Sequence, residues 1–80
     1  MFKARTADGR NNITGIKMKE LRKALKISQR ELSDRLQVVG LDIDKNAVQR
    51  IESGQRFVTD IEIISLAKVF SVTVEDLLKV

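Results

Sequence analysis

The sequence predicts a compact all-α domain built from five helices. Apolar residues recur at three- and four-residue spacing along most of the 80-residue chain, and no stretch has a strand pattern. Capping residues precede four of these apolar runs, and no proline interrupts them. Apolar residues make up 42% of the chain, which is enough for one small core at this length. The core must be aliphatic, since there is no tryptophan and only three phenylalanines.

Residues 1–11 have no useful periodicity, and Asp8-Gly9 is a turn signal. We therefore divide the chain into a flexible N-terminal arm, residues 1–11, and a single domain, residues 12–80. Lys3, Arg5 and Arg10 would let the arm follow phosphates or enter a minor groove. The alternative is a mobile start of the chain that has no partner.

A first helix is expected to begin near residue 12 or 14 and to end near residue 26. Met18, Leu21 and Leu25 lie at i, i+3 and i+7, the spacing of an inward-facing stripe. Lysines occupy its other faces. A basic amphipathic helix can also lie on a membrane, but the helices that follow can bury this stripe. We therefore expect no membrane contact.

The second helix is expected over residues 29–38. Ser28 and Glu31 have the spacing of a capping box, in which each side chain satisfies a backbone N–H group at the helix start. Leu32 and Leu36 lie one turn apart and share a face. Gly40 ends the run, since glycine readily adopts the left-handed conformation found at helix ends.

The third helix is expected over residues 45–53, with Asp44 as its N-cap. Val48 and Ile51 share the inward face. The remaining surface is basic and amide-bearing, and it carries Lys45, Asn46, Gln49 and Arg50. Side chains of these types form hydrogen bonds with base edges in the major groove of DNA. The alternative for each of them is a solvated helix face.

Two further helices are expected over residues 59–70 and 73–78. Capping-box pairs begin both, Thr59 with Glu62 and Thr73 with Asp76. The β-branched residues of the first segment would also suit a strand, but its cap, length and spacing favour a helix. The expected inward-facing residues of the two helices are Ile63, Ile64, Ala67, Phe70, Val74, Leu77 and Leu78.

Charge and composition exclude several classes of function. The net charge is +4, with nine basic and two acidic residues in the first thirty positions, which suggests a polyanionic partner. The alternative is a merely solvated surface. The absence of histidine and cysteine removes the commonest general base and the commonest metal ligands, so we expect no enzyme, cofactor or metal site. Residues 42–53 begin like a calcium loop, but Ala47 and Ser53 replace its required glycine and glutamate.

No stretch has the length of a membrane span and no export signal is evident, so we expect a cytoplasmic protein. A small-molecule ligand is not indicated.

Residues 14–78 resemble the phage-repressor type of helix-turn-helix, the Cro/cI or xenobiotic-response-element family. The resemblance is carried by five segments in order. They are Met18-Lys19-Glu20-Leu21-Arg22, Ile27-Ser28-Gln29-Arg30-Glu31-Leu32, Ala47-Val48-Gln49-Arg50-Ile51-Glu52-Ser53-Gly54, Leu66-Ala67-Lys68 and Phe70-Ser71-Val72-Thr73-Val74-Glu75-Asp76-Leu77-Leu78.

The resemblance implies a lambda-repressor-like DNA-binding domain that regulates transcription, as a repressor, and places its third helix in the major groove of double-stranded DNA. Positions implied to contact bases, or to border them, are Lys45, Asn46, Gln49 and Arg50. Positions implied to contact the DNA backbone are Gln29, Ser53, Gln55 and Arg56. Arg22 and Glu52 match a structural salt bridge between the first and third helices. Gln29 also matches a position that can brace the third helix.

The sequence departs from this family between Leu36 and the third helix, where about five extra residues stand. These residues are too apolar for a free loop, so we expect the second helix to lengthen and the turn to pack through Val38, Val39, Leu41 and Ile43. The insertion could tilt the third helix and change which of its side chains reaches a base.

A homodimer on a two-fold site is expected, because one module of this size reads few base pairs. The ends of the last two helices, near Leu78 and Val80, offer a contact. The chain could equally be the DNA-binding part of a longer protein. The main alternative function is a helical protein-interaction module, such as an antitoxin or an adaptor.

Overall fold

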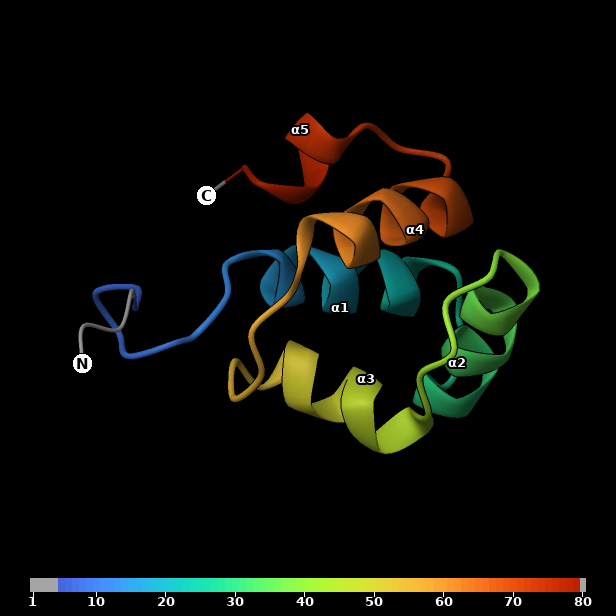
Figure 1. Cartoon of the computed structure of the whole chain (residues 1–80), viewed down its shortest axis with the longest axis horizontal. Helices are drawn as coiled ribbons and strands as arrows, with labels where there is room; N and C mark the ends of the chain where they lie inside the picture. The colour runs from blue at the N-terminus through green and yellow to red at the C-terminus, as the bar shows by residue number, and fades with distance from the viewer. Residues whose placement is uncertain (1–4, 80) are drawn as a thin grey trace.

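The computed structural model describes residues 5–79, and within them it contains five helices in the predicted order. They are α1 (Thr14–Ala24), α2 (Gln29–Val38), α3 (Lys45–Glu52), α4 (Asp60–Phe70) and α5 (Val74–Leu77). Helix α1 lies at the centre, with α3 on one side and α4 on the other (Figure 1). It contacts α3, α4 and α5, while α2 packs on α3 and α4. The predicted all-α fold is confirmed.

The core is aliphatic, as the composition requires. Side chains from all five helices meet in it, and the fully buried ones include Met18, Leu32, Leu36, Val48, Ile51, Leu66 and Leu77. The predicted inward-facing pairs of α2 and α3 are among them. The apolar face of helix α3 therefore packs against the other helices, while its exposed polar side chains lie on the opposite side.

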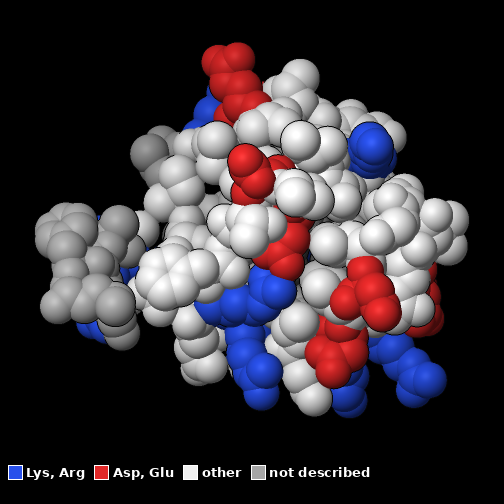
Figure 2. Space-filling model, viewed as in Figure 1, with Lys and Arg blue, Asp and Glu red and all other residues white. Residues whose placement is uncertain are grey.

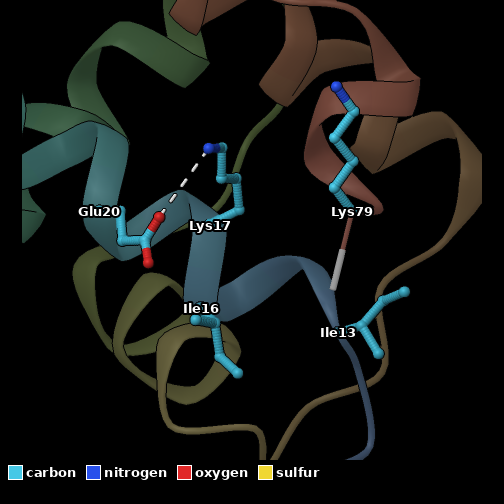
Figure 3. A pocket seen from close by; sticks show the side chains of 5 residues that line it. All are labelled: Ile13, Ile16, Lys17, Glu20 and Lys79. Carbon is cyan, nitrogen blue, oxygen red and sulfur yellow. Dashed lines mark ion pairs between the residues drawn. The ribbon is translucent and has the colours of Figure 1, made fainter.

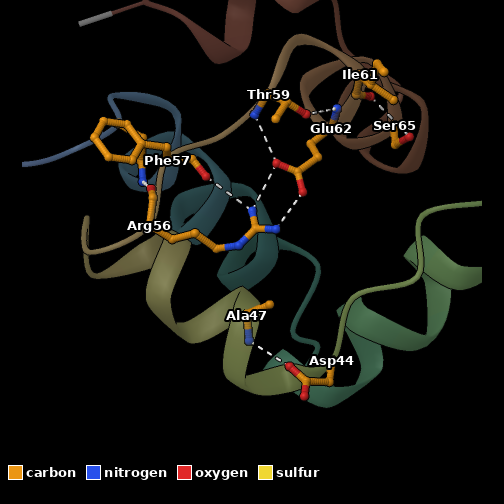
Figure 4. A network of polar contacts seen from close by, with 9 residues as sticks. Asp44, Ala47, Arg56, Phe57, Thr59, Ile61, Glu62 and Ser65 are labelled. Carbon is orange, nitrogen blue, oxygen red and sulfur yellow. Dashed lines mark hydrogen bonds and ion pairs between the residues drawn. The ribbon is translucent and has the colours of Figure 1, made fainter. Parts of the chain in front are cut away.

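Caps define where the helices begin. Asp44 accepts a hydrogen bond from the backbone N–H of Ala47 at 2.8 Å (Figure 4). The capping boxes at the starts of α4 and α5 are both complete. The box predicted at Ser28 is only half formed, since Ser28 accepts from the Glu31 N–H at 3.0 Å but the reciprocal bond from the Ser28 N–H is not made.

Helices α1 and α4 differ from the prediction in which residues they bury. Helix α1 ends at Ala24, two positions early, because Lys26 adopts a left-handed backbone conformation with φ 58°. Leu25 is then the C-cap residue, and it is exposed instead of completing the stripe. In α4 the inward position belongs to Leu66, whereas Ile64 lies on a neighbouring exposed face.

The insertion between α2 and α3 packs through only half of its apolar residues. Gly40 turns the chain with φ 94°, as predicted, and the Leu41 N–H then donates to the Leu36 carbonyl. Ile43 is buried against the core, with 8% of its surface exposed. Val38, however, is 87% exposed at the last residue of α2, so the expectation for that end of the turn is wrong.

Among the described residues, no helix combines the length and the apolar character needed to cross a bilayer.

Candidate nucleic-acid interface

Helix α3 has one buried and one polar side. Val48, Ile51 and Glu52 are buried in its eight residues. The outward side chains form two pairs at i, i+4 spacing, and all four are exposed: Lys45 with Gln49, and Asn46 with Arg50. The structure thus brings together the side chains that the sequence singled out as base contacts. Lys and Arg side chains project from the edge of the molecule on which α3 lies (Figures 1 and 2).

A buried carboxylate ties α3 to the two preceding helices. The guanidinium of Arg22 donates to both oxygens of Glu52, from Nε at 2.7 Å and from Nη2 at 3.0 Å. Gln29 donates from Nε2 to Oε1 of the same carboxylate at 3.1 Å. A buried charge without such partners is strongly destabilising. Glu52 therefore fixes α3 relative to α1 and to the start of α2.

The loop after α3 contains the three residues predicted to contact the DNA backbone there. Ser53 and Gln55 are exposed. Arg56 instead faces Glu62 at the start of α4, with Nη1 3.0 Å from Oε1 and Nη2 2.7 Å from Oε2 (Figure 4). Its Nη1 also donates to the Phe57 carbonyl at 3.2 Å. The structure thus brings Ser53 and Gln55 to the surface and holds Arg56 in an ion pair.

This ion pair changes the titration of its carboxylate. Glu62 is buried, which disfavours its charged form, but the hydrogen bonds from Arg56 outweigh this effect and lower the pKa of Glu62 below its ordinary value of 4.5. The N–H of Thr59 also donates to Glu62 at 2.9 Å as part of the capping box, and it lowers the pKa further. Glu62 therefore remains charged at neutral pH.

The sequence did not indicate that Arg10 and Asn11 bind the end of α3. They were assigned to the flexible arm, yet Arg10 donates to the Glu52 carbonyl at 2.9 Å and Asn11 donates to the Gln55 carbonyl at 2.9 Å. No spacing rule connects positions about forty residues apart. Of the arm's basic residues, Lys3 lies outside the described residues, and Arg5 is exposed.

A hollow on the surface lies away from α3. It has a volume of about 360 Å³ and is lined by Ile13, Ile16, Lys17, Glu20 and Lys79, none of which belongs to α3 (Figure 3). Each of its lysines already lies near a carboxylate: Lys17 is 3.9 Å from Glu20, and Lys79 is 3.3 Å from Asp76. The hollow is therefore no part of the α3 surface.

Comparisons with known proteins agree with this geometry. The family model described as helix-turn-helix matches residues 18–77. Among solved structures, the chain is similar to the restriction-modification controller protein C.AhdI from Aeromonas hydrophila, with a TM-score of 0.69 and 30% sequence identity. That similarity covers 80% of this chain and 86% of the other. No match was found among curated protein sequences.

Proposed function

Since the chain belongs to the helix-turn-helix family of DNA-binding transcription regulators, we propose that it is a repressor that reads one duplex sequence with α3. The observation that carries this proposal is the division of α3 into a buried apolar side and an exposed side of Lys, Asn, Gln and Arg. The major groove admits an α-helix, and these side chains match its donors and acceptors.

Base reading is assigned to the four outward residues of α3. Arg50 is the first choice for guanine, whose O6 and N7 accept a two-pronged contact from a guanidinium. Asn46 is the first choice for adenine, since an amide both donates to N7 and accepts from the amino group. Lys45 and Gln49 lie beside them and contact neighbouring bases.

Backbone contacts are assigned to Gln29, Ser53, Gln55 and Arg56. Gln29 lies at the N-terminal end of α2, where backbone N–H groups and the helix dipole favour a phosphate. Ser53 and Gln55 are exposed, which makes their side chains accessible to a phosphate. A phosphate contact by Arg56 would have to share its guanidinium with Glu62. Such contacts set the register of the protein on DNA without reading sequence.

The test is a binding assay on duplexes that carry every single-base variant of a site selected from a random pool. Arg50→Ala is expected to cost about 1–3 kcal/mol of binding free energy and to relax specificity at one base position. The matched variant Arg56→Ala is expected to weaken binding to every duplex alike. Unchanged affinity and an unchanged base profile for Arg50→Ala would show that the assignment is wrong.

Because Arg56 also binds Glu62, its replacement needs a control for the lost ion pair. Glu62→Gln removes the carboxylate and leaves the arginine in place. If Arg56 contacts a phosphate, Glu62→Gln should not reproduce the loss of affinity seen for Arg56→Ala. Similar losses in both variants would assign Arg56 to the ion pair alone.

We further propose that two copies bind a two-fold site as a homodimer. The start of α4 and the residue that follows α5 expose apolar side chains, with Ile61 70% and Leu78 40% exposed. Helices α4 and α5 contact each other, and the start of α4 and the end of α5 lie toward the same side of the molecule (Figure 1). Val80, also expected at this contact, lies outside the described residues.

A further inference from the structure

We propose that Arg10, Asn11 and Asn12, here called the N-terminal clasp, are positioning residues that hold α3 in the orientation needed to read bases. This inference rests on the proposed function of α3. The clasp precedes the residues matched by the helix-turn-helix family model, so it is a feature of this chain outside the matched range.

Arg10 binds the C-terminal end of α3. Its Nη2 atom donates to the carbonyls of Glu52 at 2.9 Å and Ile51 at 3.4 Å. Its Nε atom donates to the carbonyl of Asn12 at 3.2 Å, which keeps the guanidinium turned toward the helix. The last carbonyls of a helix have no partner within it, and a cation is favourable at that end of the helix dipole.

The two asparagines extend this contact into the loop after α3. Asn12 is buried, and its Nδ2 atom donates to Ile51 at 3.1 Å and to Arg56 at 2.7 Å. The Asn11 N–H donates to the Gly54 carbonyl at 2.8 Å, and its Nδ2 atom donates to the Gln55 carbonyl at 2.9 Å. The clasp therefore binds the carbonyls of five residues at the end of α3 and just beyond it.

Two glycines make room for the Arg10 side chain. A Cβ atom on Gly15 of α1 would lie 2.8 Å from Arg10 Nη2 and only 2.0 Å from the Ile51 carbonyl oxygen. A Cβ atom on Gly54 would lie 2.8 to 3.0 Å from carbons of the Arg10 side chain. Helix α1, the end of α3 and Arg10 therefore meet in a space that only glycine leaves open.

The position of the clasp explains why it would affect base reading. Helix α3 has only eight residues, too few to be stable alone. Arg50 lies in its last turn, next to the carbonyls that the clasp binds. Without the clasp, only the Arg22–Glu52 pair and the buried Ile51 would hold the last turn of α3 against α1, and Arg50 would be less closely fixed.

A direct phosphate contact by Arg10 makes different predictions from positioning. A phosphate contact depends on charge, so a lysine would replace it, and its loss would lower the salt dependence of binding. Positioning by Arg10 depends on the several N–H donors of its planar guanidinium group, so a lysine would not substitute for the arginine. Loss of positioning would weaken binding to the selected sequence and leave the electrostatic, non-specific part of the affinity unchanged.

The experiment measures Arg10→Met, Arg10→Lys and the control Arg5→Met by fluorescence anisotropy, against a selected duplex and a random duplex at several salt concentrations. For Arg10→Met we expect a loss of about tenfold for the selected duplex, or about 1.4 kcal/mol. Binding to the random duplex should change by less than about twofold, with an unchanged salt slope. Arg10→Lys should not restore specificity. Arg5 is exposed in the same segment, and Arg5→Met should keep the wild-type ratio of the two affinities.

Equal losses on both duplexes, a salt slope reduced by about one and full rescue by lysine would overturn the inference. A second readout needs no DNA. The N–H groups of Ser53 and Gly54 donate to carbonyls of α3, and their hydrogen exchange should accelerate about tenfold or more in Arg10→Met. Unchanged exchange would also overturn the inference.

If Arg10→Met does not fold, Asn11→Ala removes a single side-chain bond to the Gln55 carbonyl and should produce a smaller change of the same kind. If the wild-type protein selects no duplex, the proposed function fails, while the exchange measurement still decides whether the clasp holds α3.

Discussion

Glu52 and Glu62 are both buried, and each is neutralised by one arginine. The sequence indicated the first pair only through a family resemblance. It did not indicate the second, because the capping box with Thr59 already accounted for Glu62, and Arg56 was expected to face phosphates. The capping box identifies one role of Glu62. A carboxylate has two oxygens that accept several hydrogen bonds, so Glu62 can also pair with Arg56.

The Arg56–Glu62 pair predicts a pH dependence of stability. The pKa of Glu62 is lowered in the folded protein and ordinary in the unfolded chain, so the pair stabilises the fold fully above the ordinary value of 4.5. That contribution is lost as the pH falls through 4.5 toward the folded pKa. Glu62→Gln should therefore destabilise the protein at neutral pH, and the difference from wild type should shrink in acid.

Urea unfolding at several values between about pH 3 and about pH 7 measures this difference. Glu20→Gln is the control, since Glu20 is largely exposed and 3.9 Å from its lysine. It should leave the free energy of unfolding nearly unchanged. A Glu62→Gln effect of the same size at every pH would contradict the prediction.

At the scale of the element, the sequence predicted which segments are helical and most, but not all, of the side chains that they bury. Caps such as Asp44 and Thr59 act on their own helix, so local spacing is enough to place the helix starts. Burial depends on what covers each face. Leu25 and Ile64 fit an apolar stripe yet are exposed, because the backbone turns at Lys26 and Leu66 takes the inward position of α4.

The turn between α2 and α3 gives a test of this distinction. Ile43→Ala should lower the free energy of unfolding by about 2–4 kcal/mol, since it removes buried side-chain volume. Val38→Ala is the matched control on the same insertion, and it should change the free energy by less than about 0.5 kcal/mol because Val38 is exposed. Denaturant midpoints compare the two variants, and equal effects would show that the turn does not pack through Ile43.

At the scale of the whole molecule, the family and the fold were predictable, and the contacts between distant segments were not. The five helices and the face of α3 follow from periodicity and caps. The bonds from Arg10 and Asn12 to the end of α3 join segments about forty residues apart, and no local pattern encodes them. The molecule measures 35 × 22 × 21 Å, and each copy contains one α3 helix of eight residues.

Dimer formation is the prediction that belongs to this scale. Ile61→Asp places a charge among the exposed apolar side chains at the start of α4 and should weaken self-association by about tenfold or more. Val38→Asp introduces the same charge at an exposed position on α2 and should leave association unchanged. Light scattering over a range of concentrations measures both. A wild-type protein that stays monomeric at every concentration would refute the dimer.

The clasp also has a consequence for the order of folding. Its bonds join Arg10 to residues near Glu52, so they close a loop that contains all of α1 and α2. Closing a loop of this length costs conformational entropy before any contact compensates for it. The last turn of α3, which carries Arg50, should then become ordered only after α1 and α2 have packed. A nascent or partly melted chain would form this part of the proposed base-reading surface last and lose it first.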